Sequence, residues 1–130
     1  MGSIRERTIS VIEDNWSRKF VYGEWDCSIF CFECIIPDDV GLIKGTYSDH
    51  DGAQARIEAL GGYDQCARDL GGVPLEDLSM MRTGDLAELN LGPNIDNPLG
   101  VVQADRVVCN QYTGIVRYPR DLVIAAWRFD

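Results

Sequence analysis

The apolar residues of the chain follow two different periods, and the change between them falls near residue 80. In the first part they recur every three or four positions, which places them on one face of a helix. The clearest series is Ile9, Ile12, Trp16 and Phe20, and the other predicted helices cover 27–36, 53–60 and 64–70. Thr8 or Ser10 would cap the first helix, and Asp26 would cap the second.

Short β-rich segments separated by turn residues make up the rest of the chain. They cover 85–89, 99–104, 107–111, 115–118 and 123–129, with tight turns expected at 105–106 and 113–114. Helices followed by such strands predict an α+β domain, with N-terminal helices packed on a C-terminal antiparallel sheet of about five strands. We expect one domain over 1–130, with a helical half at about 1–80 and a strand half at about 81–130, because no linker-like stretch divides the chain.

The charge pattern disfavours two classes of partner. The formal net charge is −9, from 12 Lys and Arg against 21 Asp and Glu, and this charge repels phosphate groups. The longest apolar run, 28–36, contains Glu33 and is too short to span a bilayer. The first residues lack the apolar core of a secretion signal. We therefore expect no nucleic-acid partner, no membrane insertion and no signal peptide.

The five cysteines are irregularly spaced and odd in number, which favours reduced thiols over a disulfide framework. Cys27, Cys31 and Cys34 have the C-x3-C-x2-C spacing of radical-SAM iron–sulfur ligands. The same spacing places them on one stripe of a helix, and the chain is too short for the barrel that usually carries such a cluster. We therefore interpret the three cysteines as a buried helical stripe.

Cys27 is the candidate nucleophile. It follows the cap residue Asp26, so it should lie at a helix N-terminus, where backbone N–H groups and the helix dipole favour a thiolate. Gly23 permits a tight turn beside it. The alternative is that Cys27 is simply the first buried residue of the helix, and the residues alone leave both interpretations open.

A cysteine nucleophile needs a base, and His50 is the only histidine. It lies in the polar segment 48–51, which we expect to be a solvated loop before a helix, so a surface role is the favoured interpretation. A zinc site that combined it with Cys66 and Cys109 would lack a second C-x2-C or H-x3-H unit. We expect no metal site and no cofactor.

Residues 16–30, with the sequence Trp-Ser-Arg-Lys-Phe-Val-Tyr-Gly-Glu-Trp-Asp-Cys-Ser-Ile-Phe, resemble the nucleophile motif of NlpC-type papain-like cell-wall peptidases. They resemble more closely a related phage- and prophage-encoded family of unassigned function. Later motifs of that family have counterparts here in the same order: Gly45, the Leu-Gly-Gly stops at 60–62 and 70–72, Gly84-Asp85, Leu99-Gly100-Val101 and Ala126-Trp127-Arg128. The resemblance covers nearly the whole chain and implies a papain-like, NlpC-type fold.

The resemblance also implies roles for single residues. In the peptidases, the counterpart of Cys27 attacks an amide of the peptidoglycan stem peptide, a histidine in a His-Val-Gly-Ile strand is the base, and a polar residue on the next strand orients it. Gly100-Val101 matches the Gly-Ile pair, so the base position falls on Pro98 and the orienting position near Asn110. Proline accepts no proton, so we expect a loss of about 10²–10⁴ in rate. The other expected cleft residues are Gly23, Trp25, Asp26 and Asp85.

Three hypotheses follow. The first is an NlpC-like domain without efficient hydrolysis, which serves as a structural or adaptor component of a phage tail, at the tail tip. It would occupy the host cytoplasm during assembly and then the virion tail, with hub or tail-tip subunits as partners and peptidoglycan as a further ligand. The second is an active cysteine peptidase or amidase in which Asp26, Asp85, His50 or Asn110 assists Cys27. The third is a small binding module that uses the ancestral cleft.

Overall fold

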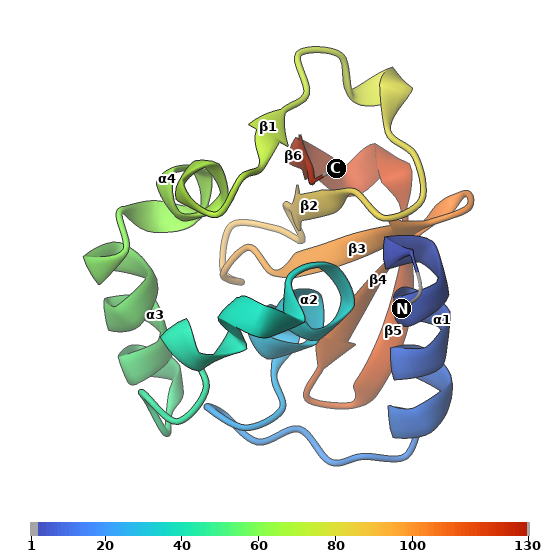
Figure 1. Ribbon diagram of the computed structural model, residues 1–130. Coiled ribbons are helices and arrows are strands. Elements are labelled where there is room, and N and C mark those ends of the chain that lie inside the picture. The colour runs from blue at the N-terminus through green and yellow to red at the C-terminus, as the bar shows by residue number, and fades with distance from the viewer. Residues whose placement is uncertain (1–2, 130) are drawn as a thin grey trace.

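Helices precede most of the sheet in the computed structural model, which describes residues 3–129. The α-helices are α1 (Ile4–Asn15), α2 (Cys27–Ile35), α3 (His50–Ala59) and α4 (Gly62–Asp69). Three 3₁₀-helices, η1 (Pro37–Leu42), η2 (Leu78–Met80) and η3 (Arg120–Leu122), lie in the connections. Figure 1 shows α2 lying across the sheet, with α1 on one side of it and α3 and α4 on the other. No helix within 3–129 is long and apolar enough to cross a membrane.

The sheet has six strands, and all of its pairings are antiparallel. In sequence they are β1 (Val73–Pro74), β2 (Leu86–Leu89), β3 (Leu99–Gln103), β4 (Arg106–Gln111), β5 (Gly114–Pro119) and β6 (Val123–Arg128). Their order across the sheet is β1-β6-β2-β3-β4-β5. The predicted α+β arrangement is confirmed, and five of the strands lie where the sequence predicts them. The sixth strand, β1, is not predicted by the sequence. It has only two residues, too few to show an alternation of apolar and polar side chains, and it is a strand only because it pairs with the distant β6.

The start of α2 is as predicted. Asp26 is its N-cap, and its side chain accepts a hydrogen bond from the Ile29 backbone N–H. The helix ends one residue before Ile36, whose N–H still bonds to Phe32, and Pro37 then begins η1. Seven of its nine residues are buried, because it packs against α1 on one side and β3 and β4 on the other.

The start of α1 and two turns differ from the prediction. Ser3, rather than Thr8 or Ser10, caps α1, and Thr8 is buried inside the helix, where its hydroxyl donates to the Ile4 carbonyl. The strand register leaves 104–105 and 112–113 as the turn residues, one position earlier than expected. Ala104 adopts the left-handed conformation with φ of 54°, which lets so short a turn close.

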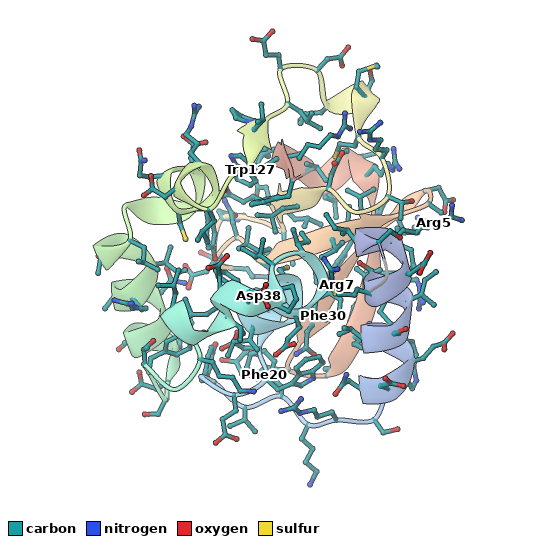
Figure 2. All side chains as sticks on the ribbon, in the orientation of Figure 1. Arg5, Arg7, Phe20, Phe30, Asp38 and Trp127 are labelled. Atoms are coloured by element: carbon teal, nitrogen blue, oxygen red, sulfur yellow. The ribbon has the colours of Figure 1, made fainter. Side chains whose placement is uncertain are left out.

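Both faces of the sheet are covered. The α2 side holds the larger core, to which Phe30 of α2 and Trp127 of β6 belong (Figure 2). On the opposite face, the fully buried Val102 and Val107 pack under apolar residues of the segment 75–81, including η2. Packing on both faces fixes the sheet, so the N-terminus of α2 is held firmly beside the start of β3.

Candidate functional site: a cleft at the N-terminus of α2

An open cleft of about 680 Å³ lies at the N-terminus of α2. Its walls come from the start of α2 and the segment before it, from α3 and the segment before it, from α4, from the connection between β2 and β3, and from the end of β4 with the turn that follows. The lining residues with polar or aromatic side chains include Phe20, Tyr22, Asp26, Cys27, Tyr47, His50, Tyr63, Asp96, Gln111 and Tyr112. Segments far apart in the sequence thus bring chemically active groups to one place.

Asp26 organises the approach to Cys27. Its carboxylate is 2% exposed and accepts hydrogen bonds from the backbone N–H groups of Gly23 and Ile29, both at 3.0 Å, and from the Tyr47 hydroxyl at 2.6 Å. Gly23 has φ of 81°, and a Cβ on it would lie 1.9 Å from the Tyr47 carbonyl oxygen. Only glycine fits there, so the Gly-x-x-Asp-Cys motif has a structural explanation: it closes the turn and caps the helix that carries Cys27.

The environment of Cys27 favours the neutral thiol. Burial raises the pKa of the Cys27 thiol, and the negative charge of Asp26 raises it further. Hydrogen bonds from the backbone N–H of Leu99 and from Ser28 act in the opposite direction without reversing the shift. Lost solvation and the charge of Asp26 thus shift the pKa of the Cys27 thiol in the direction opposite to the expected thiolate.

The start of β3 offers Cys27 no base. Pro98 is buried and lines the cleft together with Cys27, and Leu99 follows it as the first residue of β3. The pyrrolidine ring of proline carries no ionisable group, and the Leu99 N–H can only donate. The position that the resemblance assigns to the base thus shares the cleft with the thiol but carries no side chain that accepts a proton.

The side chain that lines the cleft on β4 is that of Gln111 and not that of Asn110, the expected orienting residue. Asn110 is fully buried outside the cleft lining, and its side-chain nitrogen and oxygen have no hydrogen-bond partner within 3–129. Gln111 lines the cleft, as Cys27 and Pro98 do. Successive residues of a strand point to opposite faces, so an offset of one residue changes which side chain reaches the cleft.

His50 is the first residue of α3 rather than part of a loop, and it lines the same cleft as Cys27. Its Nδ1 lies 3.3 Å from Asp51, and its Nε2 forms a hydrogen bond with Asp96. These two carboxylates raise the pKa of His50 and so favour the imidazolium. Both ring nitrogens are therefore engaged, and within 3–129 no hydrogen bond joins His50 to Cys27.

An aromatic cluster forms the rim of the cleft. The hydroxyl oxygens of Tyr22 and Tyr112 lie 2.5 Å apart, and Phe20 packs against both rings at centroid distances of 5.0 and 4.7 Å. Tyr22 also contacts the His50 ring edge-on at 6.1 Å. Sequence reasoning missed Tyr112 and Asp96; Asp96 precedes the base position by two residues, whereas nothing marks the turn residue Tyr112.

Two expected cleft residues lie elsewhere. Trp25 is 1% exposed and packs edge-on against Phe30 in the core, with the Arg18 guanidinium 4.6 Å from the centre of its ring. Asp85 is 2% exposed and accepts two hydrogen bonds from Arg128, at 3.0 and 2.8 Å, at the junction of β2 and β6. Neither lines the Cys27 cleft, and both have structural roles.

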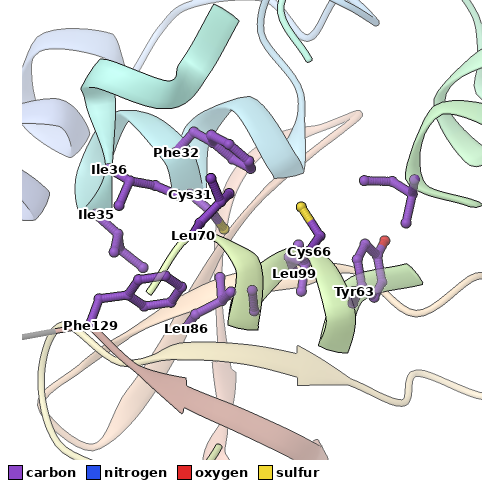
Figure 3. A pocket seen from close by; sticks show the side chains of 12 residues that line it. Cys31, Phe32, Ile35, Ile36, Tyr63, Cys66, Leu70, Leu86, Leu99 and Phe129 are labelled. Carbon is purple, nitrogen blue, oxygen red and sulfur yellow. The ribbon is translucent and has the colours of Figure 1, made fainter. Parts of the chain in front are cut away.

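A second pocket, of about 390 Å³, lies between α2, α4 and the sheet (Figure 3). Its walls are almost entirely apolar, apart from the thiols of Cys31 and Cys66 and the hydroxyl of Tyr63, which donates to the Asn97 carbonyl. Cys31 and Cys34 lie buried along α2, as the stripe interpretation predicts. Across residues 3–129, no three His, Cys, Asp or Glu side chains are arranged to hold a metal ion.

The fold and cleft define an α+β domain with a cysteine at the N-terminus of a helix that packs on an antiparallel sheet. Residues 3–129 match the family model described as a domain of unknown function, DUF6950. The chain therefore belongs to the DUF6950 family. A search of curated proteins finds none that matches it.

Proposed function

We propose that the chain is a structural or adaptor component of a bacteriophage tail, at the tail tip. Its domain would be of the papain-like, NlpC type and would have lost efficient hydrolysis of peptidoglycan. The ordered motifs of the resemblance support this origin, as does the α+β arrangement with Cys27 at the start of α2. The observation that carries the proposal is that Pro98, at the base position, shares the cleft with Cys27.

The chemistry of amide cleavage explains why this arrangement would be a poor hydrolase. A thiol must lose its proton to attack a carbonyl carbon, and the departing amine must gain one. Burial keeps the proton on Cys27, and Pro98 can neither accept nor return it. The contacts of His50 with Asp51 and Asp96 raise its pKa, which favours the imidazolium, the form that accepts no proton from a thiol.

Digestion of purified peptidoglycan tests the loss of hydrolysis. The chain and its Cys27→Ala variant would be incubated with sacculi, and released muropeptides would be measured by mass spectrometry. An active NlpC-type peptidase serves as the positive control. We expect no release that depends on Cys27, and cleavage of stem peptides by the unmodified chain but not by the variant contradicts the proposal.

The tail assignment has its own test. Phage particles produced from the genome that encodes the chain would be purified, analysed by mass spectrometry and labelled with gold-conjugated antibody. We expect the chain in the particles and the gold at the tail tips. Particles without the chain contradict the tail assignment, whatever the digestion experiment shows.

One observation favours a second candidate, an active cysteine peptidase or amidase. The His50–Asp96 pair lies on the same cleft as Cys27, so a rearrangement of the α3 start could bring the imidazole to the thiol. His50 would then take the proton from the sulfur and pass it to the leaving amine. Digestion that disappears in both Cys27→Ala and His50→Gln would support this candidate, and digestion unaffected by His50→Gln would reject it.

A further inference from the structure

Positive charge is concentrated on one face of this acidic chain. Four exposed arginines, Arg5, Arg82, Arg106 and Arg117, come from α1, the connection between η2 and β2, the β3–β4 hairpin and β5. They line two neighbouring hollows of about 850 and 590 Å³, which share Arg5 and Thr83. Figure 2 shows Arg5 at the end of α1 that adjoins the β3–β4 hairpin. Elements far apart in sequence thus gather arginines on one surface.

Part of this positive charge is not used to hold the fold together. Arg7 and Arg120 donate to backbone carbonyls and so tie elements to one another. By contrast, the side chains of Arg5 and Arg106 donate no hydrogen bond to any residue within 3–129. Two carboxylates among the described residues line the hollows: Asp85, which is paired with Arg128, and the exposed Asp105.

The same face exposes groups that typically anchor a protein partner. Trp16, at the end of α1, is 53% exposed, and the Arg117 guanidinium lies 5.4 Å from the centre of its ring. Ile9 adds an apolar side chain that is 37% exposed and lines one hollow. Tryptophan and arginine dominate the energetics of protein interfaces, and an arginine fork matches a carboxylate.

We propose that this basic face, defined by Arg5, Ile9, Trp16, Arg82, Arg106 and Arg117, docks an acidic segment of a protein partner. This inference rests on the proposed function, because that function is the reason to expect a protein as the partner. Charge complementarity selects an acidic ligand. A long polyanion such as DNA would run beyond the face onto the acidic remainder of a chain with net charge −9, whereas a short acidic segment can end within it.

The test uses a fluorescein-labelled peptide of about ten glutamates, whose binding is followed by fluorescence anisotropy at low salt. Arg5→Glu with Arg106→Glu is compared with Lys19→Glu and Lys44→Glu, two exposed lysines outside the face. Both double variants change the formal charge equally. We expect about a tenfold or greater loss of affinity in the arginine variant and less than about threefold in the lysine variant.

Three results overturn the proposal: no binding by the unmodified chain, equal losses in the two variants, or tighter binding of a short DNA duplex of the same charge. Circular dichroism checks the fold, and Arg5→Gln with Arg106→Gln replaces the arginine variant if that one does not fold. Peptide binding does not involve Cys27, so this experiment can fail or succeed independently of peptidoglycan digestion and of tail labelling.

Discussion

Asp26 and Asp85 are equally buried, each 2% exposed, yet they are held in opposite ways. Neutral donors surround Asp26: two backbone N–H groups and the Tyr47 hydroxyl. A cation faces Asp85, because the Arg128 guanidinium donates to both of its carboxylate oxygens. Hydrogen bonds from neutral groups stabilise the buried carboxylate of Asp26, whereas an ion pair stabilises that of Asp85.

This difference in partners gives the two aspartates different roles, one in the cleft and one in the sheet. Within 3–129 no cation pairs with Asp26, and its negative charge adds to burial in raising the pKa of both Cys27 and Tyr47. The charge of Asp85 is compensated by Arg128, and the pair joins the start of β2 to the end of β6. Asp26 thus sets the chemistry of a cleft, while Asp85 sets the geometry of a sheet.

Removing the scaffold carboxylate should have the largest effect. Asp85→Ala removes the carboxylate that accepts two hydrogen bonds from Arg128, and we expect a loss of about 2–4 kcal/mol in the free energy of unfolding, somewhat below the range for a fully buried pair. Arg128 is 22% exposed, and water compensates part of its charge. Urea unfolding measures the loss. Asp105→Ala, in an exposed turn, is the control and should change stability by less than about 0.5 kcal/mol.

Asp26→Asn should combine a smaller loss of stability with a change in the cleft. Asparagine can still cap α2, but its amide nitrogen cannot accept from the Gly23 N–H, so we expect a cost of about 1–2 kcal/mol. The pKa of the Cys27 thiol should fall, because the carboxylate that raises it is gone. The pH dependence of iodoacetamide labelling reports this change, since Cys31, Cys34, Cys66 and Cys109 are buried.

Asp49→Asn is the matched control for Asp26→Asn, because Asp49 caps α3 by the same kind of bond to a backbone N–H. It should cost a comparable amount of stability at most and leave the labelling of Cys27 unchanged. A Cys27 pKa that stays the same in Asp26→Asn, or rises, contradicts the assignment of this charge to the cleft.

Local signals made the start of α2 predictable. A cap residue, an apolar run and a following proline lie within 26–37, and each acts over a few residues. The sheet was predictable as a set of strands, because alternation is also local. The two residues of β1 could not be found in this way, since their strand character exists only through pairing with β6.

The cleft was predictable only in part. The proximity of Cys27 and Pro98 followed from the family resemblance, which carries tertiary information that a single sequence lacks. His50 and Asp96 are 46 positions apart in two polar segments, and no periodicity links them. The choice between Asn110 and Gln111 depends on strand register to one residue, which the sequence pattern alone does not fix.

Pro98→His asks whether the cleft becomes reactive when the base position holds an imidazole. If position 98 faces the Cys27 sulfur, a histidine there would stabilise the thiolate. We expect iodoacetamide to label Cys27 about tenfold faster at neutral pH than in the unmodified chain. Pro93→His, in the exposed β2–β3 connection, is the matched control. An unchanged labelling rate in Pro98→His would mean that this position does not face the thiol.

Asp96 is a third carboxylate to compare with Asp26 and Asp85. It is exposed and paired with His50, and we expect it to contribute least to stability. The side chains are 58% and 46% exposed, so solvent screening should hold the stabilisation to about 0.5 kcal/mol or less. Asp51 and Asp96 raise the pKa of His50, so the contribution is present while His50 is protonated and disappears as pH rises through that pKa. Asp96→Asn should therefore lower stability at about pH 5.5, below the ordinary histidine pKa, and leave it unchanged at about pH 8.5. An NMR titration should place the His50 pKa lower in the variant than in the unmodified chain, and equal values would show that the contact with Asp96 does not persist in solution.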